Sequence, residues 1–536
     1  MNFLKYLSVV TSGSDTSPFA KVCKVVLLAM AGFISLQSQA VNLTPLPPFL
    51  TETKGAPMVM LNMSKDHQLF FKAYNEFSDL DGDGVIETQY KHSYKYYGYF
   101  DNERCYSYNT TTNRYVPVSK VDAAGYCTNA TATDNWNGNF MNWGTMARMD
   151  VVRRILYGGF RAEDSAPVGS STASLTVLER AHLPSDAHAF AKYYYGTDVN
   201  KLTPFNPAST TFTIATATGT ATVTAAQITM CNVSYGNATA PANTNDDAPS
   251  ILVADGNHAL WGANERWQCY WRERIDASNG NNPAVTGLGA SGRNPERNTL
   301  ALGTGYANGS YTARVEVCKP GLPGGFTTDE DSRCKLYPRG NYKPVGLLQK
   351  YGERNEAAFG LMTGSYDRNI SGGVLRKNVA SFTDEVDLDD GQFKNVDGIV
   401  RTLNRLKVTG YSYGDGTYEG LAGGCNFQQI GLVDGECRSW GNPLGEMYLE
   451  SLRYLAGASA NPAFTTVGAP RDTDIGLTVT AWSDPFAAST VANFGNQLCR
   501  RSNVINFNAS VTSFDSNSWS GASSVSGLTT ATVDSY

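Results

Sequence analysis

Short apolar runs and amphipathic stretches follow one another along most of the chain. Apolar runs bounded by turn residues predict buried strands, and alternating β-branched and small residues predict a hairpin or two strands at 210–230. The tyrosine-rich stretch 90–100 is expected to be extended. The predicted buried strands are 56–64 and 357–366, and a further strong strand is predicted at 503–514.

Helices are predicted in several further stretches. The clearest is 142–159, where Asn142 is a good N-cap and apolar residues recur at helical spacing. Its solvent-exposed face is expected to carry Arg148, Arg153 and Arg154. The other predicted helices are 66–76, 185–195, 396–408 and 443–457. Because strands and helices alternate, the sequence predicts an α/β fold with a parallel sheet flanked by helices.

The first forty residues have the pattern of an export signal. Lysines precede an apolar run at 25–36, and the small residues Ser38 and Ala40 follow it. The run is short for a bilayer span, which needs roughly 20 residues. We therefore expect 1–40 to be a signal peptide and the mature protein to be exported. A short membrane anchor is the alternative.

Charge is sparse and slightly negative in this chain of 536 residues. Charged residues make up 17% of it and the net charge is −6, without a basic run that would attract nucleic acid. Gly, Ser, Thr, Asn and Tyr are abundant instead, which is typical of extracellular, loop-rich β structure. We therefore expect no nucleic-acid partner. The length allows several domains or one domain with large insertions.

Ten cysteines are present, and Cys23 would leave with the signal peptide. No CxxC pair occurs, so a thiolate metal site is disfavoured and disulfides are expected in an exported protein. Pairing neighbours along the chain is one hypothesis, because spacing does not determine connectivity. Cys499 is left over, and we expect its partner downstream of Tyr536, with this chain a fragment or an early-ending variant. The candidate pairs are Cys105–Cys127, Cys231–Cys269, Cys318–Cys334 and Cys425–Cys437.

The densest cluster of acids lies in the stretch 77–90. Ca²⁺ prefers six to eight oxygen ligands, and a loop with acids at alternate positions can wrap it. Acids stand here at positions 1, 3, 5 and 9 of such a loop, with a backbone carbonyl at position 7 and Gly84 at the turn. Tyr90 replaces the bidentate glutamate of an EF-hand at position 12, so we expect a stand-alone calcium loop, with a solvated polar turn as the alternative. The predicted calcium ligands are Asp79, Asp81, Asp83, Val85 and Glu87.

No catalytic constellation is recognisable. The histidines do not form an HExxH zinc motif, and no nucleophile elbow or phosphate-binding loop occurs in a supporting context. We therefore expect a protein that is not an enzyme. A secreted calcium-dependent hydrolase and a structural surface protein are the alternatives.

Several stretches carry a family resemblance: 67–101, 136–161, 176–190, 260–271, 337–353, 359–378 and 439–457. Together they resemble the N-terminal part of the PilC/PilY family, the type IV pilus tip-associated adhesins and assembly factors. The resemblance implies an exported protein at the pilus tip, cell surface or outer membrane, peripheral to that membrane. The implied partners are minor pilins and a host or abiotic surface receptor. The C-terminal β-propeller typical of the family is expected to be absent from this chain.

The same resemblance implies a von Willebrand factor A-like domain over 41–536. Large, β-rich, disulfide-stapled insertions are expected at about 67–140, which carries the calcium loop, and at about 200–345. Such domains bind Mg²⁺ at the carboxyl rim of the sheet through a DxSxS motif, a threonine and an aspartate. Asparagines stand here where the two most important aspartates are expected, and an amide is a weaker ligand for a hard dication than a carboxylate. We therefore expect a degenerate rim without Mg²⁺, made of Asn62, Ser64, Asp66, Asn442 and Asn508.

Overall fold

The computed structural model describes most of the chain beyond Lys54. The described ranges are 55–128, 136–167, 174–184, 188–216, 219–234, 248–261, 267–269, 309–411, 432–465, 470–487 and 500–515, with the single residues Tyr418, Cys425 and Val525. The predicted signal peptide, 1–40, and Cys499 lie outside them. Gly55–Tyr536 forms a compact unit, and all that follows concerns this unit.

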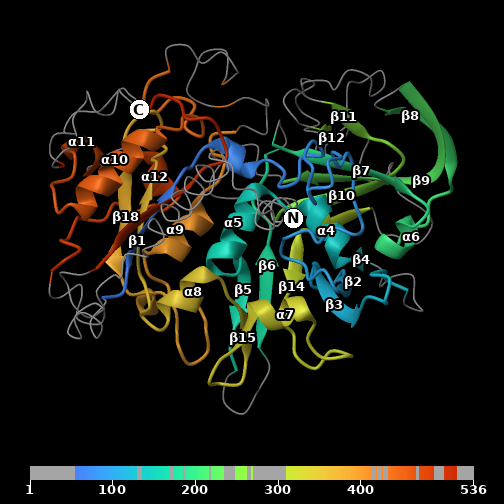
Figure 1. The fold of residues 1–536 in the computed structure, drawn as a ribbon, viewed down its shortest axis with the longest axis horizontal. Coiled ribbons are helices and arrows are strands. Elements are labelled where there is room, and N and C mark those ends of the chain that lie inside the picture. The colour runs from blue at the N-terminus through green and yellow to red at the C-terminus, as the bar shows by residue number, and fades with distance from the viewer. Residues whose placement is uncertain are drawn as a thin grey trace, which may run out of the picture. The chain divides into compact units, whose positions relative to one another are not determined.

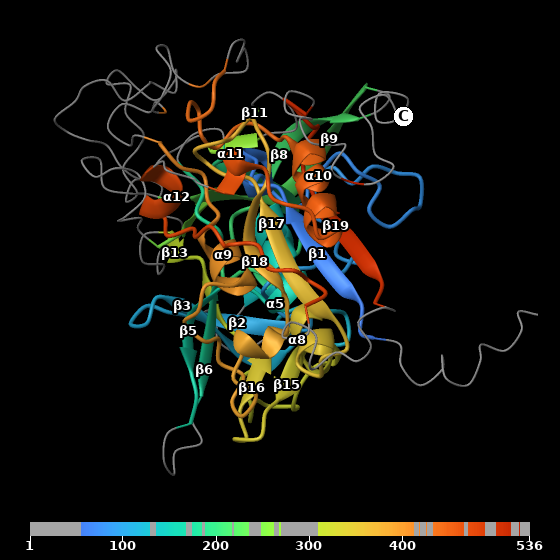
Figure 2. The ribbon, with the colours of Figure 1, turned by 90° about the vertical axis from the view of Figure 1, so that its left-hand side faces the viewer.

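The apolar runs of the sequence form a mainly parallel, four-stranded sheet in the order β18-β17-β1-β19. β1 pairs in parallel with β17 on one side and β19 on the other, and β18 runs antiparallel at the edge (Figure 2). Every residue of β17 is buried, in keeping with its continuous apolar run. The predicted parallel sheet is therefore confirmed. Its strands are β1 (Met58–Met63), β17 (Ala358–Thr363), β18 (Val374–Ala380) and β19 (Ser502–Phe507).

Short helices pack against this sheet. α10 (Leu444–Leu455) contacts β1, β17 and β19, while α8 (Leu347–Gly352) contacts β17 and α9 (Ile399–Arg405) contacts β18. α9 and α10 confirm the helices predicted at 396–408 and 443–457, within shorter bounds. Two further short helices are α11 (Pro462–Thr465) and α12 (Pro470–Asp474).

Two other sheets are built from the chain between β1 and β17. One has six strands in the order β4-β2-β3-β14-β6-β5, and the other has the order β13-β10-β9-β7, with β8 paired to β9 (Figure 1). β14 pairs with both β3 and β6, so strands from the two predicted insertions share one sheet. The strands are β2 (Arg104–Asn109), β3 (Arg114–Lys120), β4 (Trp136–Asn137), β5 (Arg161–Ser165), β6 (Leu175–Glu179), β7 (Phe190–Gly196), β8 (Thr210–Thr216), β9 (Gly219–Val233), β10 (Ser250–Asp255), β13 (Ser310–Thr312) and β14 (Arg314–Glu316).

Smaller elements complete the described structure. Two short hairpins pair β11 with β12 and β15 with β16. With the hairpin predicted at 210–230 confirmed as β8 and β9, the described residues contain more strand than helix, and their fold is mixed α/β. The remaining elements are β11 (Ala259–Trp261), β12 (Trp267–Cys269), β15 (Cys334–Leu336), β16 (Tyr342–Pro344), α6 (Val199–Leu202), α7 (Thr328–Arg333) and the 3₁₀ turns His67–Phe70 and Phe382–Asp384.

The helix predicted at 142–159 is in fact two helices. α4 (Gly138–Thr145) begins after Asn137, whose side chain caps it, and α5 (Arg148–Tyr157) follows a break. At the break, the backbone at 71–73 forms hydrogen bonds with the backbone between α4 and α5. Ala73 N–H donates to Met146 O at 2.9 Å, and Arg148 N–H donates to Phe71 O at 2.9 Å. Asn142 is therefore an interior residue of α4, and the helical apolar spacing did not reveal the break.

The prediction that the arginines of this segment face solvent was also wrong. Arg153 and Arg154 are only 2% and 4% exposed. Arg153 donates to the carbonyls of Leu403 and Leu406, at 2.8 and 3.0 Å, where α9 ends and its last carbonyls lack partners within the helix. Arg148 is half-buried and donates to Ala509 O at 3.0 Å.

Three other local predictions were wrong. Only His67–Phe70 of the predicted helix 66–76 is helical, as a 3₁₀ turn. The stretch 185–195 contains β7 rather than a helix, because seven residue pairs with β9 override its weak helical pattern. The stretch 90–100 consists of turns and irregular chain, not strand.

Three of the proposed disulfides are present: Cys105–Cys127, Cys318–Cys334 and Cys425–Cys437. Cys231 is also disulfide-bonded, and the side chain of its predicted partner Cys269 lies outside the described residues. In the part of the chain that the structure describes, no helix has the length and apolar character needed to cross a membrane.

Candidate functional site

The acidic loop 79–87 is closed by its own hydrogen bonds. The Asp79 carboxylate accepts the backbone N–H groups of Gly82 and Gly84 at 2.7 and 2.8 Å. Both glycines have positive φ, of 78° and 85°, which a residue with a side chain rarely adopts. At the base of the loop, Glu87 N–H donates to Ser78 O at 3.1 Å. Hydrogen bonds within the segment itself therefore fold the loop so that its acidic residues lie close together.

The structure brings the four predicted acidic ligands together. Carboxylate oxygens of Asp79, Asp81, Asp83 and Glu87 all lie within 4.8 Å of one another. The three aspartates are exposed, whereas Glu87 is buried and accepts the N–H of Leu80 at 2.6 Å. Val85, predicted to contribute its backbone carbonyl, belongs to the same loop and donates its N–H to Asp83 at 2.8 Å. Such a set of hard oxygen donors fits Ca²⁺.

Lys91 was missed by the sequence analysis and faces three of these acids. Its ammonium lies 2.6 Å from Asp81, 2.8 Å from Asp83 and 2.9 Å from Glu87. The hydrogen bond that Lys91 donates lowers the pKa of Asp83. The hydrogen bonds to these acids raise the pKa of Lys91, and the one to Asp81 has the largest effect. The i,i+4 spacing of Glu87 and Lys91 was the available sequence signal. The acids thus already have one positive charge that a bound metal must displace.

The predicted rim residues meet where β1 and β19 end. Ser64 Oγ donates to Asn442 Oδ1 at 2.9 Å, and Asn442 Nδ2 donates to Asn508 Oδ1 at 2.9 Å and to Ser510 Oγ at 3.0 Å. The Asn442 amide nitrogen therefore holds together the oxygens that a cation would otherwise bind. Asn62 does not join them, and instead donates to Asn506 Oδ1 at 2.7 Å.

Asp66 is the one carboxylate of this rim. It is buried, it accepts Gln68 N–H at 3.0 Å, and burial raises its pKa. A single carboxylate among neutral amides and hydroxyls is a poor ligand set for Mg²⁺, which binds through carboxylates or phosphates with retained waters. The rim residues present do not fit this metal.

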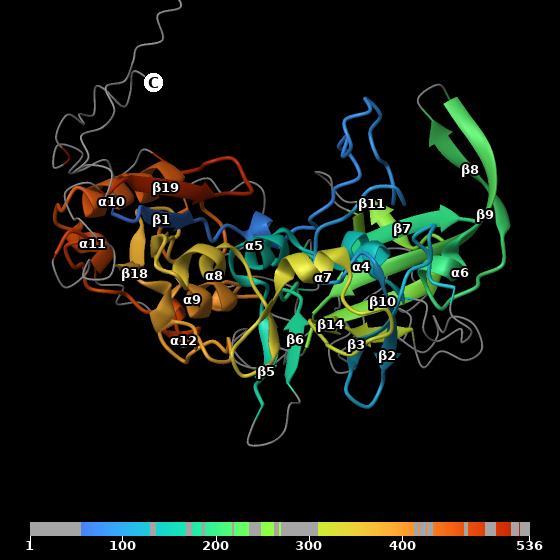
Figure 3. The same cartoon turned by 60° about the horizontal axis from the view of Figure 1, so that its bottom comes forward.

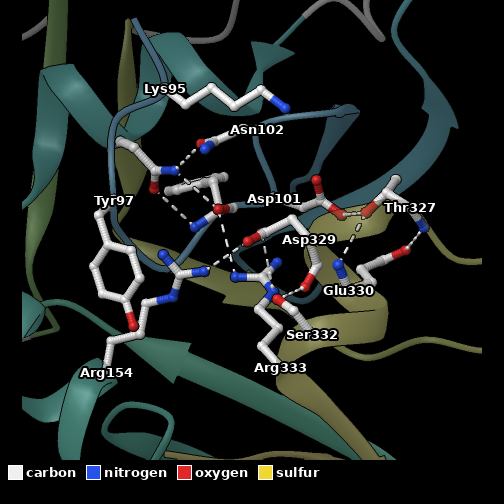
Figure 4. Close-up of polar contacts among 12 residues, drawn as sticks. Lys95, Tyr97, Asp101, Asn102, Arg154, Thr327, Asp329, Glu330, Ser332 and Arg333 are labelled. Carbon is white, nitrogen blue, oxygen red and sulfur yellow. Dashed lines mark hydrogen bonds and ion pairs between the residues drawn. The ribbon is translucent and has the colours of Figure 1, made fainter. Parts of the chain in front are cut away.

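A buried network of charges joins segments far apart in sequence, and the sequence analysis missed it. Figure 4 shows Asp329 beside the guanidinium groups of Arg154 and Arg333, while Asp101 and Glu330 contact Thr327. Arg154 donates to Asp329 at 3.0 Å and stacks 3.7 Å from the centre of the Tyr97 ring. Arg333 donates to Tyr99 O at 3.0 Å. The network ties α5 and α7 to the turns before β2.

Asp101 makes this network pH-sensitive. Burial raises the pKa of Asp101 to about 6, while Thr327 Oγ and the N–H of Glu103 donate to its carboxylate. Because the folded pKa is above the unfolded value of 3.8, the stabilising contribution of Asp101 is fully present below pH 3.8 and is lost as the pH rises through 6.

We expect Asp101→Asn to flatten the fall in stability between pH 4 and pH 7, by roughly 3 kcal/mol at most. Urea unfolding of both proteins across this range measures the difference, in which other titrating groups cancel. Parallel profiles for the two proteins would contradict the assignment to Asp101.

Comparison with known proteins shows what this chain is similar to. A family model described as "PilY1 homolog, small alpha/beta domain" matches residues 87–254, and one described as "PilY1 homolog, second domain" matches residues 359–535. A Xylella fastidiosa (strain Temecula1 / ATCC 700964) protein named "Type IV pilus biogenesis factor PilY1 homolog" is 32% identical over 481 residues, which cover 85% of this chain and 28% of the relative. This chain is similar to the PilY1-type pilus biogenesis factors.

A second X. fastidiosa protein of the same name is 32% identical over 111 residues, or 20% of this chain and 8% of that relative. The chain therefore spans less than a third of the PilY1-type relatives it matches. No solved structure matches the chain. The 359–535 match contains β18, β19 and the rim residues Asn442 and Asn508, whereas the 87–254 match begins at Glu87, the last acid of the loop.

Proposed function

We propose that this chain acts in type IV pilus biogenesis, as an exported protein at the pilus tip or outer cell surface, peripheral to the outer membrane. The observation that carries the proposal is the 32% identity over 481 residues to a protein named as a type IV pilus biogenesis factor. That name states no enzymatic activity, which favours a role through protein–protein contacts. Minor pilins and a host or abiotic surface receptor are the proposed partners.

A von Willebrand factor A-like core is the proposed platform for these contacts. In its support, β1 lies between two parallel neighbours with an antiparallel strand at one edge, and Ser64, Asn442 and Asn508 meet at the carboxyl ends of β1 and β19. Because the Asn442 amide already binds the rim oxygens, contacts at this face are proposed to use amides and hydroxyls rather than a shared Mg²⁺.

The proposal further includes a calcium ion in the loop 79–87. Four carboxylates within 4.8 Å of one another support it, since their mutual repulsion is compensated by only one positive charge, that of Lys91. Asp81, Asp83 and Glu87 would exchange the Lys91 ammonium for the ion. The loop is anchored at its start, where Glu76, whose side chain is 8% exposed, pairs with Lys72 and with Lys192 of β7. Calcium is therefore proposed to hold the loop against the β7 sheet.

Deleting the gene for this chain in the bacterium that produces it is expected to abolish surface type IV pili. The wild-type gene should restore them, and the Asp81→Ala/Asp83→Ala variant should restore them poorly, because its loop lacks two calcium ligands. Immunoblots of pilin sheared from the cell surface measure the result. Unchanged piliation in the deletion strain would contradict the pilus role, whereas full restoration by the variant would contradict only the calcium part.

A further inference from the structure

The outer edge of β8 is unusually open for strand pairing. β8 and β9 form a regular ribbon with seven consecutive residue pairs and no bulge, from Thr210 with Ala225 to Thr216 with Gly219. Among the described strands, β9 is the one partner of β8. Figure 3 shows this ribbon continuing past the part of β9 that pairs with β7 and β10. Five of the seven residues of β8 are exposed and the other two are half-buried.

Devices that normally protect an edge strand are missing here. Natural proteins protect such edges with charged residues, proline, bulges or very short strands. The edge strands β5 and β18 carry charges and register shifts, as expected. β8 has seven residues, TTFTIAT, and no charged residue occurs anywhere in 202–245. β19 is also uncharged within its own bounds, but Arg500 and Arg501 directly precede it.

The two faces of the ribbon differ in chemistry. Paired residues of antiparallel strands share a face. One face carries Phe212 with Val223 and Ile214 with Ala221, all half-buried, and Tyr195 packs against Phe212 with ring centroids 5.3 Å apart. The other face carries threonines, where Thr211 and Thr224 share a hydrogen bond of 2.9 Å. A strand added beside β8 would continue an apolar face and a hydroxyl face.

We propose that the outer edge of β8 binds an extended, uncharged segment of a partner protein, which adds to the ribbon as a further strand. The inference rests on the proposed pilus function for the identity of that partner as a pilus component. Backbone hydrogen bonds supply the affinity, and alternate apolar side chains that lie beside Phe212 and Ile214 supply the specificity. A charged segment is disfavoured because the ribbon offers no counter-charge to a desolvated ion.

The test uses the whole chain and a seven-residue peptide of alternating valine and threonine, acetylated, amidated and fluorescently labelled. Fluorescence anisotropy measures its binding, and hydrogen exchange maps its site. We expect exchange to slow by about tenfold at every second amide of β8, because amides along a strand alternate between its two neighbours. The same peptide with all its amides N-methylated should not bind.

Two matched variants locate the site. Thr213→Lys places a charge on the exposed hydroxyl face of β8 and should weaken peptide binding about tenfold. Thr222→Lys places the same charge on the same face of β9, opposite Thr213, and should bind almost as the wild type does. Circular dichroism and the calcium-dependent melting temperature should be equal for both variants.

Absent binding, equal binding of the N-methylated peptide, or equal effects of the two lysine variants would overturn the inference. A dimer in sedimentation velocity that Thr213→Lys dissociates would also overturn it, because a second copy of the chain would then occupy the edge. None of these results depends on the pilus assay. The docking edge and the pilus role can therefore fail separately.

Discussion

Replacing Glu330 by alanine is expected to lower the free energy of unfolding by about 3–5 kcal/mol. Glu330 is buried in α7 and accepts from Arg104 at the start of β2, with 2.6 Å between the charged atoms. Arg104 is fully buried, so the variant leaves a guanidinium in the interior without its carboxylate. Glu330 also accepts the N–H of Thr327 at 3.0 Å, which the variant loses as well.

The exposed pair Arg354–Glu356 provides the matched control. Its side chains are 67% and 46% exposed and its charged atoms are 2.9 Å apart, so Glu356→Ala should cost about 1 kcal/mol or less. Urea unfolding followed by circular dichroism measures both variants. A double variant, Arg104→Met/Glu330→Leu, should regain much of the lost stability because it removes both buried charges. Equal losses of unfolding free energy for Glu330→Ala and Glu356→Ala would show that the buried pair stabilises the fold no more than the exposed pair does.

The second large expected effect is a calcium-dependent rise in melting temperature. A ligand that binds only the folded state adds about 2.7 kcal/mol of stability at a concentration 100 times its Kd. We expect wild-type protein to melt several degrees higher in calcium than in chelator, and Asp81→Ala/Asp83→Ala to melt at one temperature in both. The reason is that these two carboxylates belong to the four-acid cluster, and the variant lacks them as ligands for the ion.

A control for general charge effects lies in a different acidic turn. Asp387 and Asp389 are also two residues apart; Asp387 is half-buried, Asp389 is exposed, and Asp387 accepts the N–H of Asp389 at 2.8 Å. The variant Asp387→Ala/Asp389→Ala should keep the full calcium response. If it lost the response to the same extent as the loop variant, calcium would be acting through overall charge and not through 79–87.

The sequence predicted best those elements whose residues are uniformly apolar or locally patterned. β1 and β17 are short apolar runs, and continuous apolar runs are typical of strands buried on both faces. The loop 79–87 could be predicted equally well, because its turns are formed by hydrogen bonds from N–H groups within five residues to the Asp79 carboxylate. Local disulfides such as Cys105–Cys127 followed the same rule of short separation.

Features that depend on contacts with distant segments could not be predicted from local sequence patterns. The break between α4 and α5 is caused by the chain at 71–73, and the burial of Arg153 by the end of α9. β7 has a sequence compatible with a helix and becomes a strand because β9 pairs with it. Arg104 and Glu330, separated by 226 residues, gave no local signal of their contact.

Lys91 illustrates the same limit inside the candidate site. Its i,i+4 spacing to Glu87 is a local signal that the sequence analysis did not use, and its contacts to Asp81 and Asp83 arise only because the loop turns back toward it. The rim residues were predicted in a different way. Ser64, Asn442 and Asn508 were chosen through family resemblance, and in the structure the neutral amide of Asn442 joins the other two.

Calcium titration of chelator-treated protein by isothermal calorimetry tests the central claim most directly. We predict saturable binding to wild-type protein, loss of that binding in Asp81→Ala/Asp83→Ala, and binding about tenfold tighter in Lys91→Met, where no ammonium competes for the carboxylates. Absence of binding to wild-type protein, or the same isotherm for wild type and the loop variant, would contradict the account.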